Sequence, residues 1–127
     1  MPASGDALEE ALGAKRLVLV ESPRQAYWQG QPLEADWDGQ PLLWELFWEL
    51  ASRARRGRAV DRFVLSNPES ERAIVDRRSR LGRLLPAGLN ARIEVAGRRS
   101  YRLGLGAGEV ALFLVEEERL REERAGD

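Results

Sequence analysis

The hydrophobic and polar positions of the first forty residues predict a short helix followed by strands. In the segment 4–14, Leu8 and Leu12 are four residues apart, which places both on one face of a helix. Three later segments have the alternation or the β-forming residues that are typical of strands, namely residues 16–20, 25–29 and 33–37. We therefore expect a small antiparallel sheet after the helix.

In the middle of the chain the spacing of apolar residues changes to that of helices. A helix is predicted over residues 41–55, because its leucines recur every three or four positions. Asp38 is the expected capping carboxylate, and Gly57 lies beyond the predicted C-terminal end. A second, shorter helix with Asp61 as its cap is predicted over residues 59–66.

The third predicted helix, residues 68–85, is amphipathic and basic. Its apolar stripe consists of Ile74, Leu81 and Leu85, with support from Val75 and Leu84. The rest of its surface is polar or charged, and the residues expected to face outward are Arg72, Asp76, Ser79, Arg80 and Arg83.

Strands return after this helix. Residues 92–96 and 100–104 predict a hairpin with residues 97–99 at its tip. The segment 109–115 is almost wholly apolar, which predicts a strand that is central in a sheet or covered on both faces. The highly charged tail 116–127 is predicted to be a helix.

The predicted core combines the apolar faces of the helices with the hairpin. Its expected members are Leu43, Leu46, Phe47, Leu50, Ile74, Leu81, Leu85, Ile93 and Tyr101. Trp44 and Trp48, one turn apart on the first long helix, are also interpreted as packing residues. A ligand cage would need polar residues that converge on them, and the sequence shows none.

The composition limits the classes of function that the chain can have. The 127 residues suffice for one domain, and the chain contains neither histidine nor cysteine. No apolar run reaches the roughly 20 residues of a membrane-spanning helix, and the first residues do not resemble a signal peptide. With no thiol, no imidazole and no phosphate-binding glycine loop, we expect neither an enzyme nor a bound cofactor or metal. These features favour a cytoplasmic protein.

Charge is segregated along the chain although the net charge is only −1. Residues 1–52 carry 3 basic against 9 acidic residues, residues 53–102 carry 14 against 5, and residues 103–127 carry 3 against 7. A polyanion responds to such a local basic patch more than to the net charge. One alternative is that the acidic ends neutralise the basic middle within the fold.

Five short segments occur in an order known from one family: QGQPL at 29–33, LLWELFWEL at 42–50, GRAVDRFVL at 57–65, RSRLGRL at 78–84 and RIEVAGRRSYR at 92–102. Together they resemble the OmpR-type winged-helix effector domains of bacterial response regulators. Ser100 stands where that family has a second wing glycine, and these residues contain no receiver domain, so the resemblance does not extend to signalling by phosphorylation.

The resemblance implies an α+β winged helix-turn-helix. We expect an N-terminal antiparallel sheet, a three-helix core and a C-terminal β-hairpin wing, followed by an extra strand and a tail helix. The corresponding divisions are an N-terminal extension over 1–15, the winged-helix domain over 16–104, and the extra strand and tail over 105–127.

The predicted function is DNA binding by a transcriptional regulator. The third helix would enter the major groove, and Arg98 and Arg99 on the wing would reach the minor groove or the backbone. Arg56 and Arg58 would hold phosphates, since the planar arginine fork binds phosphate oxygens in pairs. The full set of expected DNA-binding residues is Arg56, Arg58, Arg72, Asp76, Ser79, Arg80, Arg83, Arg98 and Arg99.

Two other interpretations stay open. The helix arginines could belong to an ordinary solvated surface, since Asp76 and nearby glutamates are possible partners. Alternatively, the chain could be a winged-helix module that binds a protein and no DNA. The apolar strand 109–115 favours this second alternative, because a strand at a sheet edge pairs with a partner protein or with a second copy of the chain.

Overall fold

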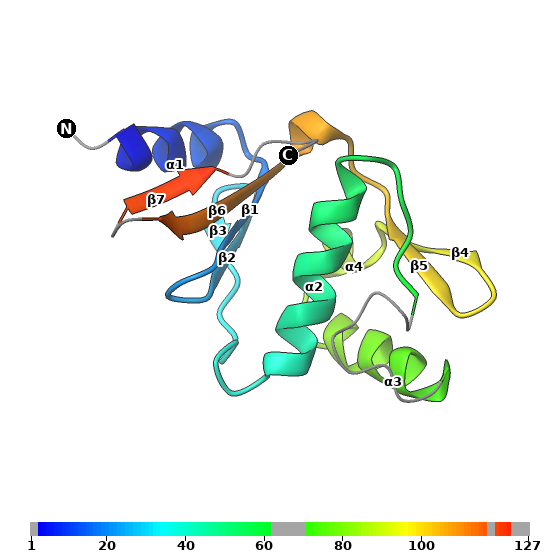
Figure 1. Cartoon of the computed structure of the whole chain (residues 1–127). Helices are drawn as coiled ribbons and strands as arrows, with labels where there is room; N and C mark the ends of the chain where they lie inside the picture. The colour runs from blue at the N-terminus through cyan, green and yellow to red at the C-terminus, as the bar shows by residue number, and fades with distance from the viewer. Residues whose placement is uncertain (1–2, 62–70, 117–118, 123–127) are drawn as a thin grey trace.

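The computed structural model describes residues 3–61, 71–116 and 119–122, and it shows an α+β fold (Figure 1). The described helices are α1 (Ala3–Gly13), α2 (Pro41–Ala54), α3 (Glu71–Gly82) and α4 (Ala87–Asn90), with a 3-10 turn η1 at Ala107–Glu109. The described strands are β1 (Leu17–Val20), β2 (Gln25–Trp28), β3 (Gln31–Pro32), β4 (Ile93–Gly97), β5 (Ser100–Leu103), β6 (Val110–Glu116) and β7 (Arg119–Glu122).

Strands from both ends of the chain form one five-stranded sheet, in the order β3-β2-β1-β6-β7. β1 and β6 run parallel, with Val18 opposite Ala111, and the other neighbouring strands run antiparallel. β1 is buried at all four positions, which explains why its sequence is continuously apolar rather than alternating.

The two faces of this sheet belong to two separate apolar clusters. Val18 and Phe113 pack on one face together with Ala11 of α1. Leu19 and Leu112 point to the other face, where they join the main core with α2 and α3. The sheet therefore lies between α1 and the remaining helices, as Figure 1 shows.

The second half of the fold is built around α2. The buried face of α2 packs against α3 and β5, and Leu46 and Ile74 lie in the same cluster. β4 and β5 form a two-stranded hairpin, and Tyr101 of β5 makes an isolated antiparallel bridge with Val60. The backbone after α2 is thus attached to the hairpin.

Most elements predicted from the sequence are confirmed. The first helix, the strands near 16–20 and 25–29, the helix 41–55, the hairpin and the apolar strand 109–115 all occur at the expected places. The predicted core residues are buried, except that Tyr101 is half-buried. Most of the helix predicted over 59–66, and the start of the third helix, fall on residues 62–70, which lie outside the described residues. Within the described residues Val60 forms a β-bridge instead of a helix, and the third helix ends at Gly82 rather than at residue 85.

Several details of the prediction were wrong. The segment 33–37 forms no strand, although Leu33 and Trp37 are buried as their alternation suggested. Gln40, rather than Asp38, occupies the N-cap of α2, and its side chain makes no capping hydrogen bond. Val75 is exposed instead of belonging to the apolar stripe, and the short helix α4 was not predicted.

The predicted tail helix is also wrong, because its described residues form the strand β7. β7 pairs with β6, whose other edge pairs with β1. Backbone groups along an apolar strand need hydrogen-bond partners, and this need outweighs the helix propensity of a glutamate- and arginine-rich segment. Both edges of the strand 109–115 are therefore occupied within the chain, and neither is open for pairing with a second one.

The sheet itself also differs from the expectation. It is mixed rather than an N-terminal antiparallel meander, because β6 inserts beside β1 in the parallel direction. In the part of the chain that the structure describes, no helix has the length and apolar character needed to cross a membrane.

Candidate nucleic-acid interface

The outward face of α3 carries the residues that the sequence assigned to DNA binding. Ile74 and Leu81 anchor the helix in the core, so the opposite side faces solvent. The exposed residues on that side are Arg72, Asp76, Ser79 and Arg80 of α3, together with Arg83 in the turn directly after the helix. The structure thus brings all five together on one face, with three guanidinium groups and one carboxylate.

Two further arginines of α3 point inward and fix the helix in place. Arg77 Nη1 lies 3.6 Å from Glu45 Oε1 on α2. Arg78 Nη2 donates a hydrogen bond of 3.3 Å to the backbone oxygen of Asn90 in α4. Burial lowers the pKa of the Arg78 guanidinium, and an electrostatic interaction with Tyr101 of β5 acts in the opposite direction. These contacts connect α3 to α2, α4 and the hairpin.

The hairpin β4–β5 presents Arg98 and Arg99 at its tip. Both side chains are exposed, and Arg99 has a φ of 53°, in the left-handed region. Gly97 has a φ of 147°, which a residue with a Cβ rarely adopts. Lower on the hairpin, Arg102 Nη2 lies 3.3 Å from Glu94 Oε2 across the two strands. The charge of the tip is therefore carried on a short, structurally defined turn.

The structure does not bring Arg56 and Arg58 to α3. Both are exposed and follow the C-terminal end of α2. α3 instead contacts α2 near Glu45, about 14 Å along the helix axis from this end. Figure 1 shows these opposite ends of α2 clearly. Arg56 and Arg58 line a small polar hollow of about 260 Å³ together with Glu49, Ser52 and Arg53.

The basic elements lie apart from the acidic ends of the chain. In Figure 1, α3 and the hairpin occupy the side of the molecule away from the five-stranded sheet, and α1 lies on the far side of that sheet, with β7 at the sheet's edge. Glu122 of β7 is 3.4 Å from Arg16, at the far edge of the sheet. The described part of the tail, β7, carries two arginines and one glutamate and does not cover α3 or the hairpin.

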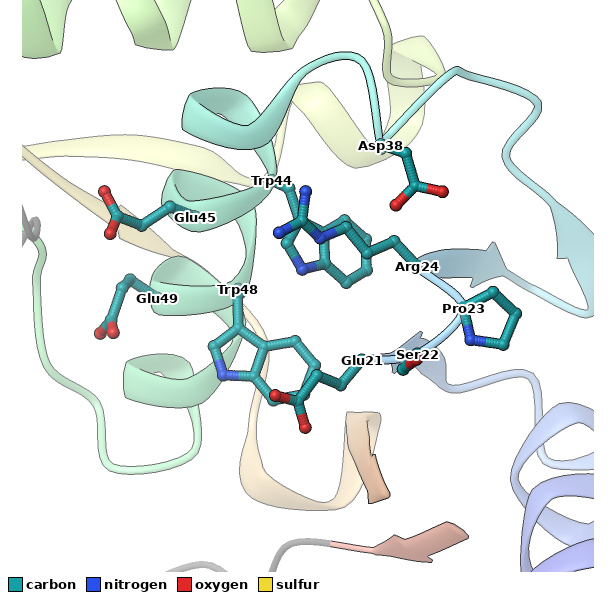
Figure 2. A pocket seen from close by; sticks show the side chains of 9 residues that line it. All are labelled: Glu21, Ser22, Pro23, Arg24, Asp38, Trp44, Glu45, Trp48 and Glu49. Carbon is teal, nitrogen blue, oxygen red and sulfur yellow. The ribbon is translucent and has the colours of Figure 1, made fainter. Parts of the chain in front are cut away.

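A hollow of about 740 Å³, shown in Figure 2, is the feature that the sequence did not reveal. Trp44 and Trp48 line it, as do charged residues from the turn after β1 and from the start of α2. Polar residues converging on these tryptophans were not expected from the sequence, because Glu21 and Arg24 are about twenty residues away along the chain. Only the folded sheet places that turn beside α2.

Other chemistry is not apparent in the described residues, which contain no group of three or more potential side-chain metal ligands. Comparison with protein-family models, with curated proteins and with solved structures gives no match for the chain. The function is therefore inferred from the site itself.

Proposed function

We propose that the protein is a winged-helix DNA-binding protein that acts as a transcriptional regulator. The observation that carries this proposal is the position of the arginines. Arg80 lies on the outer face of α3, Arg83 follows in the turn after it, and Arg98 and Arg99 lie on the hairpin. Both α3 and the hairpin lie on the side of the fold away from the five-stranded sheet. Such a local field favours a polyanion despite a net charge of −1.

The order of the described elements supports the winged-helix interpretation. A core helix, α2, is followed by the extended residue Val60, by α3 and then by the hairpin. In a winged helix the extended segment pairs with the wing, as Val60 does here with Tyr101. The helix expected between Val60 and α3 falls on residues outside the described ones.

In this proposal, α3 lies in the major groove of a duplex. Arginine side chains engage guanine edges or phosphate oxygens with two parallel hydrogen bonds. Ser79 contacts bases or the backbone, and the Asp76 carboxylate accepts a hydrogen bond from a base such as cytosine. The hairpin tip follows the adjacent minor groove or the phosphates, where contacts set orientation more than sequence preference. Arg56 and Arg58, at the other end of α2, add less to affinity.

The alternative function, a winged-helix module that binds a protein, is favoured by one observation. Val95 on the hairpin is 76% exposed, and Val75 on α3 is exposed as well. Apolar side chains beside arginines are common in protein interfaces. A titration with DNA separates the two functions.

The experiment is a fluorescence-anisotropy titration with a labelled mixed-sequence duplex at about 50 mM salt, where even non-specific binders have measurable affinity. We expect the logarithm of the association constant to fall linearly with the logarithm of the salt concentration, with a slope of about −0.9 per phosphate contacted. Arg80→Gln should weaken binding about fivefold or more, which corresponds to the loss of one good contact. Lys15→Gln removes one positive charge near the sheet and serves as the matched control. Absence of binding at about 100 μM protein would exclude this function, because non-specific dissociation constants do not exceed that range.

A further inference from the structure

The hollow beside α2 combines two indole rings with carboxylates. Trp44 and Trp48 are one turn apart on α2, with ring centroids 6.0 Å apart and planes inclined by 41°. Glu45 and Glu49, also one turn apart, line the same hollow. The rest of its lining consists of the turn after β1 and the residue Asp38, which precedes α2.

The carboxylates of this hollow fall into two groups. Glu45 and Glu49 each have an arginine partner, Arg77 at 3.6 Å and Arg53 at 3.5 Å. By contrast, the side chains of Glu21 and Asp38 have no hydrogen-bond or ion-pair partner among the described residues. Two carboxylates without a counterion therefore lie at the same hollow as two aromatic rings.

This combination is suited to a cation that carries an apolar or planar surface. The face of an indole ring attracts a positive charge through its quadrupole, and the attraction grows when the site is sheltered from water. Carboxylates at the rim add a Coulombic attraction. An anion is disfavoured, because the two carboxylates without a counterion, Glu21 and Asp38, outnumber the one guanidinium group of the lining, that of Arg24. A volume of about 740 Å³ lies within the usual range for organic ligands of roughly 300–1,000 Å³.

Arg24 gives the site a further property. It belongs to the turn after β1 and lines the hollow, and Figure 2 shows its side chain extending from the turn towards α2. Its guanidinium group has the same charge as the expected ligand. Arg24 therefore competes with a bound cation, and its removal favours binding.

We propose that this hollow binds an organic cation, namely an alkylated ammonium or a guanidinium group, either free or on a peptide side chain. The indole ring of Trp48, which is partly buried, contacts the apolar or planar surface of the cation, and Trp44, only 5% exposed, adds the part of its ring that lines the hollow. Glu21 and Asp38 neutralise its charge. This proposal is independent of DNA binding, because the hollow and the outer face of α3 share no residue.

The binding test uses N-acetyl-argininamide and tetramethylammonium as free cations, and a short peptide with one arginine between glycines as the peptide source. The matched neutral ligands are N-acetyl-citrullinamide and the corresponding citrulline peptide, and sodium chloride controls for ionic strength. The indole N–H signals in ¹H–¹⁵N spectra report on the chain's 4 tryptophans separately. We expect the indole signals of Trp44 and Trp48 to shift in a saturable way and that of Trp28 to stay unchanged. The dissociation constant should be in the millimolar range, which is typical of one small contact.

Variants show whether the named side chains hold the cation. Glu21→Gln and Trp48→Leu should each weaken binding about three- to tenfold. Arg24→Gln should strengthen it. Glu34→Gln and Trp28→Leu are the matched controls, since neither residue lines this hollow, and they should leave the affinity unchanged. Glu21 is exposed, so its substitution tests the site even if the Trp48 variant does not fold.

The result also identifies the source of the cation. Saturation by a free cation alone indicates a small molecule, whereas tighter binding of the arginine peptide indicates a protein partner. Either result supports the proposal. Equal shifts with the citrulline ligands, shifts that do not saturate, or equal weakening by the Glu21 and Glu34 substitutions would overturn it.

Discussion

Arg77 of α3 and Glu45 of α2 form an ion pair, 3.6 Å from Nη1 to Oε1, in which the arginine side chain is only 7% exposed. The pair fixes the rotation of α3 about its axis. Because Arg77 points inward, positions on the opposite side of the helix, such as Arg72 and Ser79, turn towards solvent. The arginine-bearing face of α3 thus depends on a buried contact that no base or phosphate would touch.

Loss of this pair should reduce stability. Glu45→Gln leaves the buried Arg77 guanidinium without its charged partner, and we expect the free energy of unfolding to fall by ~1–3 kcal/mol. Glu49→Gln is the matched control, since the pair of Glu49 with Arg53 is much more exposed and should contribute less than ~1 kcal/mol. Urea unfolding measures both. Equal effects of the two substitutions would mean that Arg77 does not depend on Glu45.

The core between the sheet and the helices should respond strongly to truncation. Leu46→Ala is expected to lower the free energy of unfolding by ~2–5 kcal/mol, because a fully buried leucine leaves a cavity. Leu42, on the same helix but 46% exposed, provides the comparison: Leu42→Ala should cost less than ~1 kcal/mol. Thermal unfolding followed by circular dichroism distinguishes the two. A small effect at Leu46 would mean that the buried face of α2 has been assigned wrongly.

Removal of β7 should change the oligomeric state. A chain that ends at Glu116 keeps β6 but loses the strand that pairs with its outer edge, and an open apolar edge favours pairing between chains. Sedimentation velocity should therefore show self-association of the shortened chain and a monomer for the full chain. If both sediment as monomers with equal stability, β7 does not protect this edge.

The hairpin tip should contribute to DNA affinity without affecting the fold. The double variant Arg98→Gln with Arg99→Asn removes two charges, and asparagine tolerates the left-handed backbone found at position 99. We expect weaker binding to all duplex sequences alike and a shallower salt dependence, because the tip contacts phosphates and groove shape. The melting temperature should stay unchanged. A loss confined to one sequence would assign base recognition to the tip instead.

The sequence predicted what depends on short-range periodicity and missed what depends on long-range pairing. The exposure of the outer face of α3 was correctly predicted, since the positions of Arg72 and Arg80 follow from those of Ile74 and Leu81 on one helix. By contrast, the parallel pairing of Leu19 with Leu112 joins residues that are more than ninety positions apart, and no local pattern encodes it.

The same reason explains the errors at the tail and at the hollow. The tail has the composition of a helix, but the open edge of β6 offers hydrogen bonds that a strand alone can use. Trp44 and Trp48 pack against the core as expected, yet Glu21 reaches them only because β1 ends beside α2. Contacts between a turn and a helix depend on the arrangement of the whole sheet.

The central claim is tested most directly by mapping the DNA contact on the protein. At 14.3 kDa, the ¹⁵N-labelled chain is suited to amide chemical-shift mapping during titration with a mixed-sequence duplex at low salt. The proposed function predicts saturable shifts at Arg72, Asp76, Ser79, Arg80, Arg83, Arg98 and Arg99, with smaller shifts after α2 at Arg56 and Arg58 and none along α1 or β7. Absence of shifts, or shifts centred on the five-stranded sheet, would contradict it.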